Sequence, residues 1–206
     1  LSEFGVVGHA RRDQLRQNHR RSGSAAVDRD TVWQHVDEQR LEIADLIESI
    51  DARDPALWST PSLCDGWTVA NVAAHLTHST IAMPRMLLEA ARSGFRFNAL
   101  VHRLAVTDSR PPAQIAADLR GIVGSRRHPP GTTVLEPLID VLVHAQDICI
   151  PLGIDRAMPT DAAAAAADRL WHMGFPFHAR RRLANYRLVA TDADFDVGDW
   201  REIRAP

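Results

Sequence analysis

One stretch of the sequence, residues 134–148, constrains the fold more than any other because it combines a helical apolar pattern with acids and a histidine. At about 100° per residue, the side chains of Glu136, Asp140, His144 and Asp147 fall within a stripe about 80° wide. A surface helix has a broad polar face, whereas apolar residues fill the rest of this wheel. The stretch therefore predicts a helix buried on most sides. Acids one turn apart repel each other, so we expect a metal ion or an arginine over Glu136 and Asp140.

Other stretches have helical periodicity, and we expect helices at residues 31–50, from 68 to just before 94, at 95–106, at 111–123 and at 160–171. Thr31 and Gln34 have capping-box spacing at the start of the first helix, and Pro84 is expected to kink the second. Residues 186–192 are the only segment that alternates like a strand, and no further strand of useful length is expected after it. Four amphipathic helices with modest loops indicate an all-α protein: a four-helix bundle with an extra C-terminal helix and a short β segment.

The sequence divides into a disordered basic tail at residues 1–29, a helical bundle at 30–175 and a C-terminal extension with a short strand at 176–206. The tail is polar, mostly cationic and without an apolar period, so it cannot bury enough surface to fold alone. We expect a solvated tail in preference to a nucleic-acid contact.

Composition narrows the possible partners and the compartment. The formal net charge of -2 and the pI near 6.6 give no global electrostatic reason to bind nucleic acid or an anionic membrane. No apolar run reaches the length of a membrane span, and the first residues have no signal-peptide core. The two cysteines, Cys64 and Cys149, do not resemble a disulfide framework, so we expect a cytoplasmic protein. All 24 basic residues are arginine, which indicates a GC-rich bacterial genome.

Three residues are candidate metal ligands. Asp140 and His144 are four residues apart, the spacing at which helical bundles present inward-facing ligands. His75 lies at the edge of the apolar side of the second expected helix and would supply a third ligand across the core. Two nitrogens and one carboxylate oxygen suit zinc, with positions left open for water or substrate. The alternative for His75 is a hydrogen-bonded core histidine, and ten histidines also give many chance pairings.

Several motifs together resemble a known family. They are Thr60–Val69 (TPSLCDGWTV), Val72–Leu76 (VAAHL), Asp140–Ile148 (DVLVHAQDI), Pro151–Gly153 (PLG) and Leu188–Asp192 (LVATD). With their spacing retained over roughly residues 31–192, they resemble the mycothiol-dependent maleylpyruvate isomerase family, within the DinB-like superfamily.

The resemblance implies a DinB-like bundle that holds a divalent metal, usually zinc and alternatively nickel, through His75, Asp140 and His144. The isomerase is usually described with glutamate at the position of Asp140, so Glu136, one turn earlier, is a possible substitute ligand. Asp147 and Gln146 match the family motif as hydrogen-bonding partners of a ligand or of the helix end, and a purely structural hydrogen bond is the alternative for Asp147.

The resemblance also implies the chemistry. In this family the thiol cosubstrate is mycothiol, the low-molecular-weight thiol of actinobacteria, and its metal-bound thiolate would attack a small electrophile, giving isomerisation or S-transfer. Neither cysteine is expected to act as a nucleophile. Cys149 stands where the family often has arginine, and Cys64 is expected to be a small buried filler.

Two departures keep other functions open. The chain ends shortly after Asp192, so the C-terminal extension looks truncated beside the family, and many relatives of this bundle have no established activity. The alternatives are a non-catalytic DinB-like metal-binding protein, for which a homodimer is possible, and a structural bundle whose acidic stripe is solvated or paired with arginine.

Overall fold

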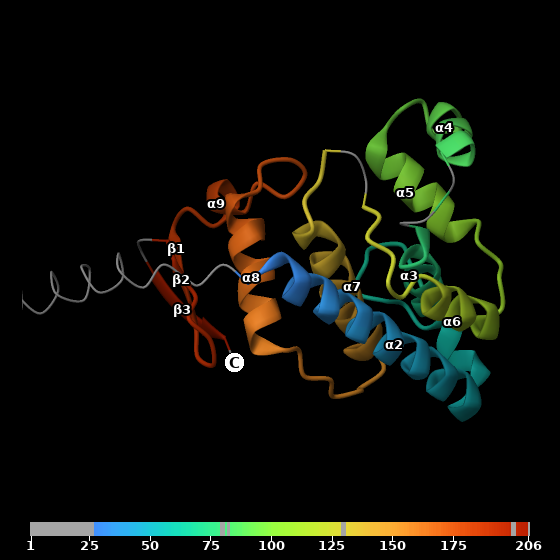
Figure 1. The fold of residues 1–206 in the computed structure, drawn as a ribbon, viewed down its shortest axis with the longest axis horizontal. Coiled ribbons are helices and arrows are strands. Elements are labelled where there is room, and N and C mark those ends of the chain that lie inside the picture. Colours follow the sequence, from blue (N-terminus) through green and yellow to red (C-terminus); the bar gives the residue numbers. More distant parts are fainter. Residues whose placement is uncertain (1–26, 79–80, 82, 129–130, 199–200, 206) are drawn as a thin grey trace, which may run out of the picture.

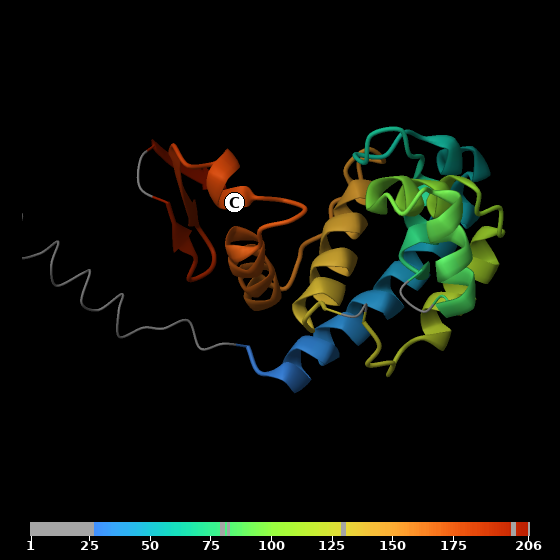
Figure 2. The same cartoon turned by 90° about the horizontal axis from the view of Figure 1, so that it is seen from above.

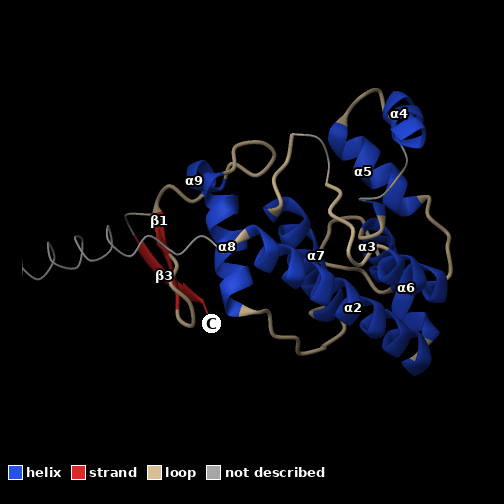
Figure 3. Ribbon diagram, in the orientation of Figure 1, coloured by secondary structure: helices blue, strands red, loops and turns tan. Residues whose placement is uncertain are grey.

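The computed structural model describes residues 27–78, 81, 83–128, 131–198 and 201–205 (Figure 1). The helices are α2 (Arg29–Arg53), the 3-10 helix η1 (Pro55–Ser59), α3 (Val69–His75), α4 (Met83–Arg92), α5 (Phe97–Val106), α6 (Pro112–Gly121), α7 (Leu135–Cys149), α8 (Thr160–His172) and α9 (Ala179–Arg182). The strands are β1 (Tyr186–Ala190), β2 (Asp196–Val197) and β3 (Arg201–Ala205). Helices dominate the described chain and the strands gather at one end (Figure 3). The all-α prediction with a short β segment is confirmed, whereas residues 1–26 of the expected tail lie outside the described residues.

The main core lies where α2, α3, α6 and α7 meet, as the four-helix prediction requires (Figure 1). Ile43 and Ile47 from α2, Leu119 from α6 and Ile148 from α7 are fully buried there. Ile43 and Ile47 are one turn apart on α2 and therefore lie on the same face of that helix. The pair α4 and α5 lies outside this core, with α5 packed on α3 (Figure 2).

A second core joins α8 to the N-terminal halves of α2 and α7. Trp33 of α2 and Leu138 of α7 are buried against Ala162 and Ala166 of α8. The alanine run therefore acts as a close-packing surface, and α8 is the extra C-terminal helix expected from the sequence.

A three-stranded sheet in the order β2-β1-β3 follows α9 (Figure 1). The expectation that no useful strand follows β1 is wrong, because β2 pairs antiparallel with β1 and β3 pairs parallel with it. The turn after β2 needs glycine, since Gly198 has φ +86° and a Cβ there would lie 2.0 Å from the Tyr186 carbonyl oxygen. Strand β2 has only two residues, which is too short for an alternation pattern, and the parallel pairing of β3 with β1 is set by tertiary structure.

Two helix boundaries also differ from prediction. The N-cap of α2 is Asp28, whose carboxylate accepts from the backbone N–H groups of Asp30 and Thr31, so the capping box expected at Thr31 is wrong. The expected helix from residue 68 is two helices, because α3 ends at His75 and α4 begins at Met83. Pro84 therefore occupies the first turn of a new helix, where its missing N–H has no cost.

Along the described residues, none of the helices is both long and apolar enough to cross a membrane.

Candidate metal centre

The short helix α3 positions His75. The Thr68 hydroxyl accepts from the backbone N–H of Asn71, and the Asn71 side chain accepts in return from the backbone of Thr68, which closes a capping box. Val72, one turn before His75, is fully buried and fixes the helix against the core. The imidazole of His75 consequently projects toward α7 with only 16% of its side chain exposed.

On α7, Asp140 and His144 face the same point. The Asp140 Oδ1 atom lies 3.4 Å from His75 Nε2 and 3.5 Å from His144 Nε2, and all three ligand atoms lie within 4.8 Å of one another. Tetrahedral zinc with ligands at about 2.0–2.1 Å holds neighbouring ligand atoms about 3.3–3.4 Å apart. The carboxylate thus stands at ligand spacing from both imidazoles. With Asp140 33% exposed, one side of the group is open to solvent.

The charges in this group stabilise one another. Burial would raise the pKa of Asp140, but the hydrogen bond with His75 and the charges of His75 and His144 outweigh it and hold that pKa below its usual value. Burial would likewise lower the pKa of His144, but its hydrogen bonds with Asp147 and Cys64 and the charge of Asp140 raise that pKa to about 10. The positive charge beside Asp140 thus comes from histidine, where the sequence predicted a metal ion or an arginine.

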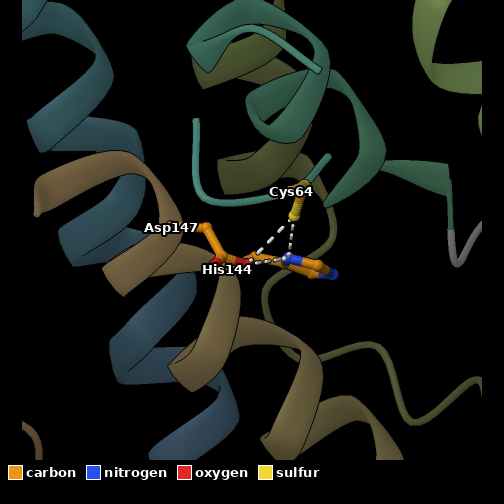
Figure 4. Close-up of side chains that lie close together, drawn as sticks. All are labelled: Cys64, His144 and Asp147. Carbon is orange, nitrogen blue, oxygen red and sulfur yellow. Dashed lines mark hydrogen bonds and ion pairs between the residues drawn. The ribbon is translucent and has the colours of Figure 1, made fainter. Parts of the chain in front are cut away.

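A second group of side chains shares His144 (Figure 4). The Nδ1 atom of His144 lies 2.8 Å from Asp147 Oδ2 and 3.6 Å from the sulfur of Cys64, whose thiol lies 3.2 Å from the same Asp147 oxygen. The expectation that Cys64 is a buried filler is wrong, because it is only partly buried and its thiol belongs to this polar group. A carboxylate on one ring nitrogen of histidine leaves the other ring nitrogen aimed at a metal position.

The indole of Trp67 forms a wall beside both imidazoles. Its ring centroid lies 5.2 Å from that of His75 and 6.4 Å from that of His144. Its Nε1–H donates to His102 Nδ1 at 2.8 Å, which ties the loop before α3 to α5. An apolar wall lowers the local dielectric and strengthens the electrostatic interactions of the group.

The other residues of the stripe have structural partners. Glu136 accepts from Arg169 of α8 and from Thr133, so it lies away from the group and is not the substitute ligand considered above. Gln146 donates to the Arg156 carbonyl oxygen at 2.8 Å and fixes the chain after α7. Cys149 is fully buried, and burial raises the pKa of its thiol.

Next to the group, His78 lines a hollow of about 540 Å³ together with Asp108 and Arg110. The His78 ring lies 5.8 Å from that of His75, but none of the three candidate ligands lines this hollow. The convergence of ligand atoms, not a cavity, therefore defines the candidate site.

Comparison with family models matches residues 36–128 to the family described as "Mycothiol maleylpyruvate isomerase N-terminal domain". This part of the chain is therefore similar to that family. The match confirms the resemblance, and it includes Cys64, Trp67 and His75 but ends before Asp140 and His144. Comparisons with curated proteins and with solved structures gave no match.

Sequence reasoning brought together His75, Asp140, His144 and Asp147 but missed the contributions of Cys64 and Trp67. Both lie in the TPSLCDGWTV motif, only three residues apart. The available signal was a cysteine and a tryptophan a few residues before α3, the helix that carries His75. Their roles depend on how the loop folds back over α7, which spacing alone does not give.

Proposed function

We propose that this protein is a metal-dependent enzyme of the isomerase or S-transferase type that uses mycothiol as its thiol cosubstrate. His75, Asp140 and His144 would hold a divalent metal, with zinc as the first expectation and nickel as the second. The observation that supports this most is the convergence of three ligand atoms from two helices at distances that suit tetrahedral coordination.

Metal binding would displace the proton from His144 Nε2. Two neutral imidazoles and one carboxylate would then leave a bound divalent ion with net positive charge and an open coordination position. When bound, zinc lowers the pKa of a coordinated thiol and so supplies a thiolate near neutral pH. No cysteine of the chain is needed as the nucleophile.

The chain's own residues would orient and shield this chemistry. Asp147 accepts from His144 Nδ1 and so directs the Nε2 atom toward His75 and Asp140. Trp67 covers the imidazoles on one side, while the partly exposed Asp140 marks the side from which a thiol and an electrophile would approach.

A mass-spectrometric assay of mycothiol adducts with a panel of small electrophiles tests this function. We expect adduct or isomer formation by the zinc-loaded protein and its loss in His75→Ala. His172→Ala serves as the matched control, because His172 is exposed on α8 and belongs to neither group of candidate ligands among the described residues. Zinc-loaded protein without turnover over the whole panel would instead support a non-catalytic metal-binding protein.

A further inference from the structure

The loop before α3 holds Cys64 against the end of α7. The Ser62 hydroxyl accepts from the backbone N–H of Cys64 at 3.1 Å, and the Leu63 N–H donates to the Asp147 carbonyl oxygen at 3.3 Å. The Cys64 carbonyl oxygen accepts from the Trp67 N–H at 3.0 Å. Hydrogen bonds on both sides of Cys64 thus fix the loop, and the thiol has a defined position.

The thiol of Cys64 and the ring of His144 share one acceptor. Asp147 Oδ2 lies 3.2 Å from the Cys64 sulfur and 2.8 Å from His144 Nδ1 (Figure 4). Only 14% of the Asp147 side chain is exposed, so little water is available to replace either donor. Removing the thiol therefore removes one of the two contacts that hold the carboxylate in place.

The distances indicate that Cys64 and Asp147 position His144 and do not themselves bind the metal. Two ligands of one zinc ion lie about 3.3 Å apart, whereas 2.8 Å between His144 Nδ1 and Asp147 is the length of a hydrogen bond. The atoms around His144 Nε2 have the longer, ligand-like spacing of 3.5 Å to Asp140. The metal position accordingly lies on the Nε2 side, and Cys64 lies on the opposite side of the ring.

We propose that Cys64 is a positioning residue of the metal centre, whose thiol holds Asp147 so that Asp147 in turn aims His144 Nε2 at the metal. This inference rests on the proposed metal site but not on any particular reaction. It also makes the sulfur a point at which covalent modification weakens metal binding, since a modified sulfur cannot donate to Asp147.

Cobalt(II) affinity and the absorption spectrum of the cobalt-loaded 206-residue chain test the proposal. Loss of an outer hydrogen-bonding partner costs about 10- to 100-fold in metal affinity. Because Cys64 acts through Asp147, we expect a loss of about tenfold in Cys64→Ala. Cys64→Ser keeps a donor and should restore most of the affinity, whereas Cys64→Val, of similar size without a donor, should not.

Cys149→Ala is the matched control, because it removes the thiol of the other cysteine, which is fully buried and belongs to neither group of candidate ligands among the described residues. It should lower the melting temperature of the metal-free protein with little change in cobalt affinity. Should Cys64→Ala not fold, the Ser and Val variants decide the question between them.

Two results would overturn the positioning role: equal cobalt affinity in wild type, Cys64→Ser and Cys64→Val, or a near-ultraviolet thiolate-to-cobalt band in the wild type, which would make Cys64 a direct ligand. Wild-type protein that binds neither cobalt nor zinc would overturn the proposed function as well. Failure of the metal site can be distinguished from failure of the positioning role, because the wild-type protein alone reveals it.

Discussion

Replacing Asp108 by asparagine should make the protein less sensitive to acid. The Asp108 carboxylate is 7% exposed, lies 3.1 Å from His78 Nε2 and accepts from the backbone N–H of Arg110 at 3.1 Å. Burial would raise its pKa, but the hydrogen bonds and charge of Arg110 and the bond with His78 hold the pKa far below its usual value. The Arg110 guanidinium also pairs with Asp118 of α6.

The direction of the change in stability with pH follows from proton binding to Asp108. A carboxyl group whose pKa is depressed on folding stabilises the native state above its unfolded-state pKa of about 3.9 and loses that contribution as the pH falls. If Asp108 stays ionised in the native state at pH 3, wild type should lose about 1.3 kcal/mol between pH 5 and pH 3 through this one group. Asp108→Asn lacks that loss, although it should be less stable than wild type at pH 5.

Urea unfolding of both proteins at pH 5 and pH 3 measures the effect. Other carboxyl groups are common to the two chains, so their contributions cancel in the difference. We expect the stability gap between wild type and Asp108→Asn to shrink by about 1 kcal/mol over this interval. A gap that stays constant or widens would show that Asp108 is not held ionised by Arg110 and His78.

Two further substitutions test the fold. Leu119→Ala removes a fully buried side chain from the main core and should cost about 2–5 kcal/mol, measured by urea unfolding at neutral pH; a loss below about 1 kcal/mol would contradict the tight packing of α6. Gly198→Ala places a Cβ against the Tyr186 carbonyl oxygen at positive φ and should lower the melting temperature, with weaker amide protection in β1 by hydrogen exchange. Unchanged protection there would contradict the turn after β2.

The helical bundle was predictable because the pattern of apolar residues that specifies each helix lies within that helix. Apolar residues at helical spacing identify α2, α6, α7 and α8, and the buried faces of these helices are the ones that their patterns indicate. Helix ends were harder to predict, since Thr31 had a capping pattern yet Asp28 makes the cap. Where two neighbouring residues could each cap a helix, the surrounding structure decides which one does.

The proposed ligands could be selected from the sequence for the same reason, since Asp140 and His144 share one face of one helix. What the sequence could not give was which acid of the stripe faces His75. Glu136 and Asp140 occupy equivalent positions one turn apart, and only the packing of α8 brings Arg169 to Glu136 and leaves Asp140 for the imidazoles. Long-range contacts such as this one, and the docking of Cys64 on Asp147, arise from tertiary structure.

Metal content of the purified protein tests the central claim most directly. Wild type, His75→Ala, His144→Ala and the control His172→Ala would be compared by elemental analysis, as purified and after incubation with zinc or nickel. We predict about one ion per chain in wild type and in His172→Ala, and little metal in the other two variants. Wild-type protein that contains no metal and takes up neither zinc nor nickel would contradict the claim.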